Sequence, residues 1–183
     1  MKNRSETATP ILLAWSGGKD CLLALQRLRA DSRWRVTGLL TTITQQFDRV
    51  AMHGIRRGVL RAQATVLDVP LIESEMDWPA SNDAYETAFA ASLQSAQAIT
   101  PGLQHIAFGD LFLEDVRQWR EALLARHSWR GVYPLWGEDT AKLSREFVAQ
   151  GHHAVLTCVD TTQLDARFSG REFDAGLLDE LPA

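Results

Sequence analysis

The most constraining feature of this sequence is a regular alternation of short apolar runs with segments of helical periodicity. Several of the runs are almost continuously apolar, as expected of strands that are covered on both faces. They are Ile11–Trp15, Val36–Ile43, Pro70–Met76, His105–Phe108, Val132–Leu135 and Ala154–Val159. Because parallel strands need crossover segments between them, this alternation predicts an α/β fold with a mainly parallel sheet.

The segments between the runs carry apolar stripes at helical spacing. They predict helices at about Lys19–Ala30, Ile55–Leu67, Asp83–Ala98, Glu114–Arg126 and Thr140–Gln150, and a short amphipathic piece at Phe173–Leu181. The block Phe47–Ala51 is expected to be a loop. We expect residues 1–10 to form a disordered tail and residues 11–183 to form a single domain, with a C-terminal extension from about residue 130.

Composition and charge exclude several classes of protein. The net charge of −4 argues against general binding to nucleic acid or to an anionic membrane, because phosphate neutralisation needs a surplus of Lys and Arg. The apolar run Ile11–Trp15 is far shorter than the ~20 residues of a membrane span. Two cysteines, Cys21 and Cys158, provide neither a disulfide framework nor a zinc site. We therefore expect a cytoplasmic protein with no nucleic-acid or membrane partner.

The segment Ser16-Gly17-Gly18-Lys19-Asp20-Cys21 follows the first apolar run and opens the first helix. Two glycines let the backbone approach an anion, and the helix N-terminus adds partial positive charge, so phosphate is the natural ligand. Ser16 can donate its hydroxyl to phosphate, Lys19 can neutralise a leaving group, and Asp20 can hold Mg²⁺.

Other interpretations of this segment stay open. Its glycines would also suit an ordinary tight turn between strand and helix, although the adjacent Ser, Lys and Asp favour phosphate binding. The spacing is that of neither a Walker A loop nor the GxGxxG of a dinucleotide fold. Cys21 is either a reactive thiol at a helix N-terminus or a small-residue replacement, and we favour the replacement.

Ser-Gly-Gly-Lys-Asp followed by a small residue resembles the pyrophosphate loop (PP-loop) of the ATP pyrophosphatase superfamily, the adenine nucleotide alpha hydrolase-like proteins. Its members cleave ATP between the α and β phosphates and transfer AMP to an acceptor. Further blocks, from about Ile11 to Leu181, resemble the diphthine-ammonia ligase-like branch. They are His53-Gly54, Gln63-Ala64, Gly109-Asp110, Glu114-Asp115-Val116-Arg117 and Pro134-Leu135-Trp136-Gly137.

The resemblance implies a Rossmann-like, three-layer α/β/α sandwich with five parallel strands in the order 3-2-1-4-5. It also implies that ATP, with Mg²⁺ on Asp20, lies across the carboxyl ends of the strands, and that catalysis involves Lys19, Asp20, Asp110 and Arg117. The nucleotide contacts carried over are Ser16, Gly17, Gly18, Lys19, Asp20, Cys21, Thr41, Thr42, His53, Gly54 and Gly109. Thr41 and Thr42 are expected at the end of the second strand.

Several of these residues also have plain structural interpretations. Asp110 can bind Mg²⁺ or orient ammonia, or it can belong to the N-cap region of a helix. Glu114 and Asp115 suit a first helical turn electrostatically. Arg117 is a candidate anion clamp, and Trp136 either stacks on a substrate or packs in the core. His53 either contacts the nucleotide or simply starts a helix.

The function that we expect is ATP-dependent carboxylate-amine ligation, in which an unidentified carboxylate acceptor is adenylated and then attacked by ammonia. A tRNA-modifying PP-loop ATPase is an alternative, weakened by the absence of a CxxC pair and of a basic surplus. A module that binds ATP or AMP without turnover is a second alternative. The sequence is also compatible with a homodimer.

Overall fold

We describe the protein from a computed structural model, which describes residues 8–51 and 53–182. The chain divides into two compact units, Met1–Trp136, here the N-terminal unit, and Gly137–Ala183, here the C-terminal unit. Residues 1–7 of the expected disordered tail lie outside the described residues. The first strand already begins at Thr9, inside the segment expected to be a tail.

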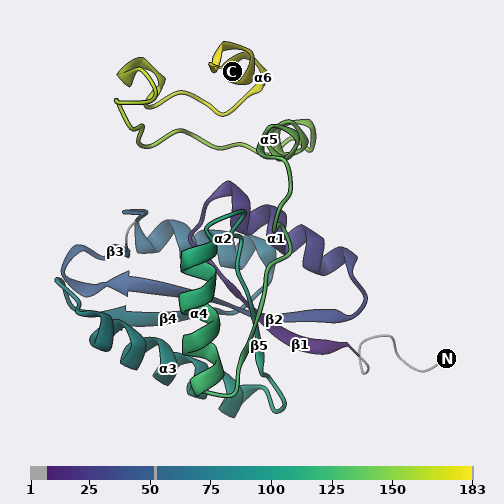
Figure 1. Cartoon of the computed structure of the whole chain (residues 1–183), viewed down its shortest axis with the longest axis vertical. Helices are drawn as coiled ribbons and strands as arrows, with labels where there is room; N and C mark the ends of the chain where they lie inside the picture. The colour runs from purple at the N-terminus through teal and green to yellow at the C-terminus, as the bar shows by residue number, and fades with distance from the viewer. Residues whose placement is uncertain (1–7, 52, 183) are drawn as a thin grey trace. The chain divides into compact units, whose positions relative to one another are not determined.

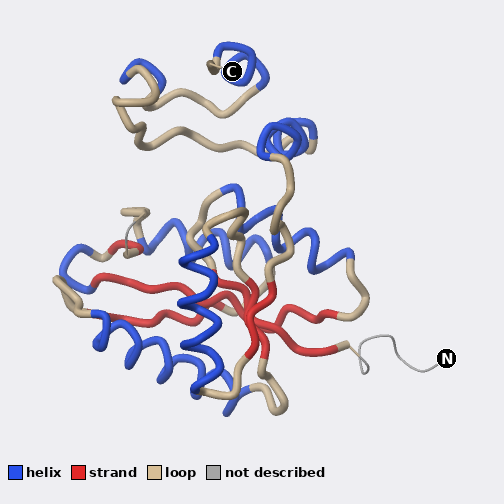
Figure 2. The backbone as a smooth tube through the Cα atoms, in the orientation of Figure 1, coloured by secondary structure: helices blue, strands red, loops and turns tan. Residues whose placement is uncertain are grey.

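The N-terminal unit is built on a mainly parallel sheet with helices on both faces (Figure 1, Figure 2). Its strands are β1 (Thr9–Ala14), β2 (Trp34–Thr44), β3 (Arg49–Val50), β4 (Leu71–Met76), β5 (His105–Ala107) and β6 (Arg130–Val132). The five parallel strands pair in the order β4-β2-β1-β5-β6. Counted along the chain this is the expected order 3-2-1-4-5, and the Rossmann-like α/β fold class is confirmed.

The sheet contains one strand more than the five expected. β3 runs antiparallel to the end of β2, with Ile43 opposite Val50. The block Phe47–Ala51, expected to be a loop, therefore holds this strand. Asp48, at φ 50°, turns the chain so that it can fold back on β2. A strand of only two residues leaves too short a pattern in the sequence to be predicted.

The expected strand Ala154–Val159 does not form. Val155 makes only an isolated antiparallel bridge to Glu172, and more than half of the Val155 side chain is exposed. An apolar run becomes a strand only where a neighbouring strand satisfies its backbone groups, and here the described part of the C-terminal unit supplies a single bridge.

The helices follow the predicted ones closely. They are α1 (Lys19–Ala30), α2 (Arg57–Leu67), α3 (Asn82–Ile99), α4 (Glu114–Arg126), α5 (Thr140–Ala149) and α6 (Ala175–Glu180). α2 starts two residues later than expected because Arg56 bridges to Arg49 and the Ile55 carbonyl accepts a hydrogen bond from Val50. Ser81 is the N-cap of α3, and its side chain accepts a hydrogen bond from the backbone N–H of Ala84.

The two faces of the sheet carry separate cores. α1 and α2 cover one face, and α3 and α4 cover the other (Figure 1). On the second face, side chains of β1, β2 and β5 pack against both helices in one buried cluster that includes Leu12, Leu40, Leu93, Ile106 and Leu124. Loops at the carboxyl ends of the parallel strands stay outside both cores, where ligands bind in open α/β sheets.

The C-terminal unit is small and helical. Leu143 and Phe147 of α5 are buried, as is Leu177 of α6, and the Phe147 and Phe173 rings meet edge to face with centroids 5.8 Å apart. Asp174 caps α6 by accepting a hydrogen bond from the backbone N–H of Leu177. Among the helices of the described residues, none combines the length and apolar character that crossing a membrane requires.

Candidate functional site

The turn between β1 and α1 depends on a glycine at position 17. Gly17 has φ +82°, in the left-handed region, and a Cβ built on it would lie 2.7 Å from Leu60 Cδ2 and 3.1 Å from Gln63 Oε1. Both neighbours belong to α2. A side chain at this position would therefore strain the backbone and collide with the adjacent helix, so the tight turn has a packing cause as well as a conformational one.

The N-terminus of α1 is open in a way that suits an anion. Gly18 is the N-cap residue and provides no side-chain cap. A Cβ added to Gly18 would meet, of the part of the chain that the structure describes, only the Ser16 hydroxyl oxygen, at 3.5 Å, so these residues leave the space above this backbone clear. The N–H groups of a first helical turn have no acceptor within their helix, and the helix dipole makes them electropositive.

Charged side chains stand at this same turn. The Lys19 ammonium lies 2.5 Å from an Asp20 carboxylate oxygen, and both side chains are partly exposed. The Ser16 hydroxyl oxygen accepts a 3.4 Å hydrogen bond from the Gly18 N–H. Ser16, Gly18, Lys19 and Asp20 are thus brought together, as the sequence predicts. No cluster of three or more His, Cys, Asp or Glu side chains suited to a metal occurs within residues 8–51 and 53–182.

Cys21 acts within the turn as a structural group. Its thiol donates a hydrogen bond to the Gly18 carbonyl, at 3.0 Å, and the Ser16 hydroxyl lies within donating distance of the sulfur, at 3.7 Å. The side chain is buried, and this burial raises the pKa of the Cys21 thiol. A neutral, buried thiol is a poor nucleophile, which favours the small-residue interpretation of Cys21 over the reactive one.

Gly109 joins the loop after β5 to the same helix end. A Cβ on Gly109 would lie 3.0 Å from the Asp20 carbonyl carbon and oxygen and 3.1 Å from the Cys21 backbone nitrogen. Because these neighbours are backbone atoms, they cannot move aside as a flexible side chain would. Glycine at position 109 therefore lets the loop after β5 pack against the first turn of α1. This packing explains the glycine without any contact to a nucleotide.

Asp110 is not a helix cap. α4 begins after Leu113, which provides no side-chain cap, and the Asp110 carboxylate instead forms an ion pair with Arg120 of α4. The Arg120 guanidinium also lies over the Phe108 ring, 4.5 Å from its centroid. The N-cap interpretation of Asp110 is therefore wrong, and the loop after β5 is tied to the helix that follows it.

Arg117 is held between aromatic rings. Its guanidinium carbon lies 4.7 Å from the centroid of Tyr133 and 4.6 Å from that of Trp136, and its Nε donates a 2.9 Å hydrogen bond to Glu121. Trp136 is half-buried against Arg117 and Tyr133 rather than enclosed in the core. Glu114 and Asp115 are exposed in the first turn of α4, and Glu114 accepts a hydrogen bond from Gln118, four residues further along the helix.

The remaining expected contacts lie along β2 and the segment after it. Thr41 and Thr42 do not end the strand, because β2 continues to Thr44. The Thr41 hydroxyl is buried and has no hydrogen-bond partner among the described residues, whereas the Thr42 carbonyl accepts a hydrogen bond from Ala51. His53 is exposed. Gly54 adopts φ +66°, and its carbonyl accepts a hydrogen bond from Arg49.

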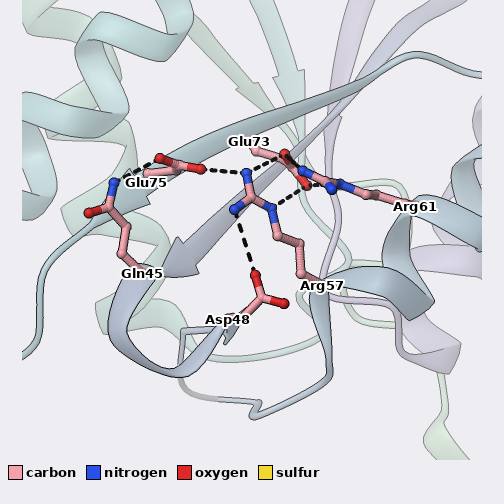
Figure 3. Close-up of polar contacts among 6 residues, drawn as sticks. All are labelled: Gln45, Asp48, Arg57, Arg61, Glu73 and Glu75. Carbon is pink, nitrogen blue, oxygen red and sulfur yellow. Dashed lines mark hydrogen bonds and ion pairs between the residues drawn. The ribbon is translucent and has the colours of Figure 1, made fainter.

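An ion-pair network centred on Arg57 was missed by the sequence analysis (Figure 3). Arg57, at the start of α2, bonds to Glu73 and Glu75 of β4 and lies 3.6 Å from Asp48. Arg61, one turn further along α2, makes two more hydrogen bonds to Glu73. Arginines four residues apart on a helix and glutamates two apart on a strand share a face, so this spacing was the available signal.

The network fastens α2 to the sheet. Hydrogen bonds from Arg57 and then from Arg61 lower the pKa of Glu73 to about 2. α2 also carries Leu60 and Gln63, which pack against Gly17. The ion pairs of Arg57 and Arg61 therefore also hold in place the helix that packs against the β1–α1 turn.

The two cysteines offer a direct test of the Cys21 assignment. We expect a maleimide reagent at pH 8 to label the exposed Cys158 quickly and the buried Cys21 slowly, with both labelled at similar rates in denaturant. Mass spectrometry of peptides over time measures the two rates in one sample, so Cys158 serves as the internal control. Faster labelling of Cys21 than of Cys158 in the folded protein would show an activated thiol and contradict the structural role.

The Arg57 network predicts an acid-dependent stability. Its depressed pKa means that Glu73 stabilises the fold fully above its ordinary value of 4.5 and loses this contribution as the pH falls toward about 2. Glu73→Gln should therefore be less stable than the wild type at pH 7, with the deficit shrinking between pH 5 and about pH 2. Urea unfolding across this range measures it, and Glu172→Gln, which removes an exposed carboxylate, is the control. A deficit that is independent of pH would mean that the ion pairs do not stabilise the fold.

Comparison with known protein families agrees with the geometry. The model of the family described as the diphthamide synthase N-terminal domain matches residues 10–129, more than half of the 183 residues. The match includes the β1–α1 turn, α2 and the loop after β5, while the block Pro134–Gly137 lies beyond it. No curated protein matches the chain closely enough to count as a relative. The chain belongs to the diphthamide synthase N-terminal domain family, which is a family of PP-loop ATP pyrophosphatases.

Proposed function

We propose that this protein is an ATP-dependent carboxylate-amine ligase, which transfers AMP to the carboxylate of an acceptor and releases pyrophosphate. Membership of a PP-loop family implies the use of ATP, and the ligase reaction is our extension of it. The observation that carries the proposal is the uncapped N-terminus of α1, which has Lys19 and Asp20 in its first turn and clear space above Gly18.

The residues of this turn fit a polyphosphate. Gly18 leaves room for phosphate oxygens to reach the N–H groups, and the Ser16 hydroxyl can turn to donate to one of them. On binding, the Lys19 ammonium would give up its ion pair with Asp20 and contact the β and γ phosphates instead. The Asp20 carboxylate would then be free to hold Mg²⁺. Bound Mg²⁺ would neutralise charge on the departing pyrophosphate. The buried Thr41 hydroxyl, which has no hydrogen-bond partner within residues 8–51 and 53–182, is a further polar group on the strand next to β1.

The proposed reaction has two steps. An acceptor carboxylate oxygen attacks the α phosphorus, a new O–P bond forms, and the bond to the bridging oxygen breaks with pyrophosphate as the leaving group. Ammonia then attacks the acyl carbon, the C–N bond forms, AMP leaves with the former carboxylate oxygen, and the nitrogen loses a proton to solvent. Lys19 and the helix N–H groups contribute by stabilising the charge that collects on pyrophosphate.

We assign the acceptor to the loops after β5 and β6. Arg117 is fixed between Tyr133 and Trp136, so its orientation is set before any ligand arrives. Exchange of its bond to Glu121 for one to a substrate carboxylate would make it the anion clamp expected from the sequence. Gly109 packs against the first turn of α1, and Asp110 is the next residue along the chain. From this position, next to the β1–α1 turn, the Asp110 carboxylate would orient the ammonia.

Product analysis with a lysine variant tests the nucleotide half of the proposal. The wild type should convert ATP to AMP and pyrophosphate, and Lys19→Ala should lower the rate 10²–10³-fold, about 2.7–4 kcal/mol, because the charge on the leaving group loses its counter-charge. Lys142→Ala, on α5, removes an exposed lysine elsewhere and should leave the rate unchanged. Formation of ADP and orthophosphate, or an unimpaired Lys19→Ala, would overturn the proposal.

A paired measurement tests the acceptor half. Arg117→Ala should leave the calorimetric affinity for ATP within about threefold, yet lower acceptor-dependent release of pyrophosphate at least tenfold, since its binding energy is used only when the reacting groups meet. A panel of carboxylates with ammonium supplies the acceptor. Arg126→Ala removes another arginine of α4, one that pairs with Glu86, and is the control. Loss of ATP affinity in Arg117→Ala would place this residue in the nucleotide site instead.

A further inference from the structure

Gln63 of α2 links two parts of the β1–α1 turn through its amide group. Its Oε1 accepts a 3.0 Å hydrogen bond from the indole Nε1–H of Trp15, and its Nε2 donates a 3.1 Å hydrogen bond to the Gly17 carbonyl. Trp15 itself is buried, and its backbone N–H is bonded to Leu40 of β2. A single side chain of α2 thus bonds both to the residue that follows β1 and to the first glycine of the β1–α1 turn.

The chemistry of the indole fixes which way the Gln63 amide points. An indole N–H can only donate, so the atom facing Trp15 must be the amide oxygen. The NH₂ group is then directed to the other side, where the Gly17 carbonyl is an acceptor. The amide therefore cannot turn round without leaving two donors, or two acceptors, face to face.

Gln63 in turn fixes the peptide between Gly17 and Gly18. In a trans peptide the carbonyl and the following N–H point in opposite directions, so a Gly17 carbonyl held toward α2 directs the Gly18 N–H away from α2. That N–H faces the Ser16 hydroxyl oxygen, at 3.4 Å. A peptide between two glycines has little steric resistance to rotation, so its orientation needs such an external restraint.

We propose that Gln63 is a positioning residue that orients the Gly17–Gly18 peptide so that its N–H faces the polyphosphate, with Trp15 setting the orientation of Gln63. The inference rests on the proposed function, because it assigns the polyphosphate to this turn. Gln63 does not touch the ligand itself. It acts through the backbone, and the preset N–H lowers the cost of organising the site at the moment of binding.

Two variants separate the two halves of the link. Gln63→Leu removes both hydrogen bonds. Gln63→Glu keeps an acceptor for Trp15 but offers no N–H to the Gly17 carbonyl. Gln97→Leu is a matched control, because Gln97 of α3 also donates its Nε2–H to a backbone carbonyl, that of Leu103, in a loop outside the β1–α1 turn. Each variant is compared with the wild type by thermal unfolding, by ¹⁵N–¹H spectra without ligand, and by calorimetric titration with magnesium pyrophosphate.

We expect the Gly18 amide resonance to shift or split in both Gln63 variants and to stay in place in Gln97→Leu. Pyrophosphate affinity should fall about tenfold in Gln63→Leu and at least as much in Gln63→Glu, while Gln97→Leu stays within twofold at a comparable loss of melting temperature. A general loss of packing would instead move many resonances and weaken all three variants in proportion to their stability.

Two results would overturn the inference. The first is an unchanged Gly18 resonance in both Gln63 variants, whatever the affinity. The second is a changed Gly18 resonance with unchanged pyrophosphate affinity in the variants. A wild type that binds neither pyrophosphate nor ATP would refute the proposed function and, with it, the ligand-facing role of Gly18, whereas the ligand-free spectra would still report whether Gln63 holds the peptide.

Discussion

The close contact between Gly17 and α2 is the constraint on which the rest of the site depends. A Cβ at position 17 would lie 2.7 Å from Leu60, so the strand-to-helix turn and the wall of α2 leave room for hydrogen alone. This contact places the turn directly against α2, one residue before the N-cap of α1. The loop after β5 then meets the same turn through Gly109, whose neighbours are the backbone atoms of Asp20 and Cys21.

α2 can hold this position against the β1–α1 turn because ion pairs attach it to the sheet. Arg57 and Arg61 share Glu73, and Arg57 also reaches Glu75 and Asp48, so the first turns of the helix are tied to β4 and to the segment before β3 (Figure 3). Ion pairing at Arg57, apolar packing at Leu60 and polar restraint at Gln63 act within the first two turns of one helix. The β1–α1 turn is therefore held from outside, by a helix that provides none of the turn's charged groups.

The sequence predicted the features that are local. A leucine stripe and a preceding glycine pair placed α1, and residue types alone marked Ser16, Lys19 and Asp20 as groups of one turn. The strand order came from the family resemblance. Features that depend on pairing between separate segments were missed: β3 needs the end of β2, the Arg57 network needs the register of β4, and Ala154–Val159 lacks the neighbour that a strand requires. Glycine at position 109 was expected to contact nucleotide, and a packing cause emerged only in three dimensions.

The central claim is that the β1–α1 turn is the polyphosphate site, and amide chemical shifts test it most directly. Titration of the ¹⁵N-labelled protein with magnesium pyrophosphate should move the backbone resonances of Gly18, Lys19 and Asp20 more than any others, because their N–H groups open the helix. Saturable shifts centred instead on another surface, such as the hollow lined by Phe47, Arg49 and Arg56, would contradict the account.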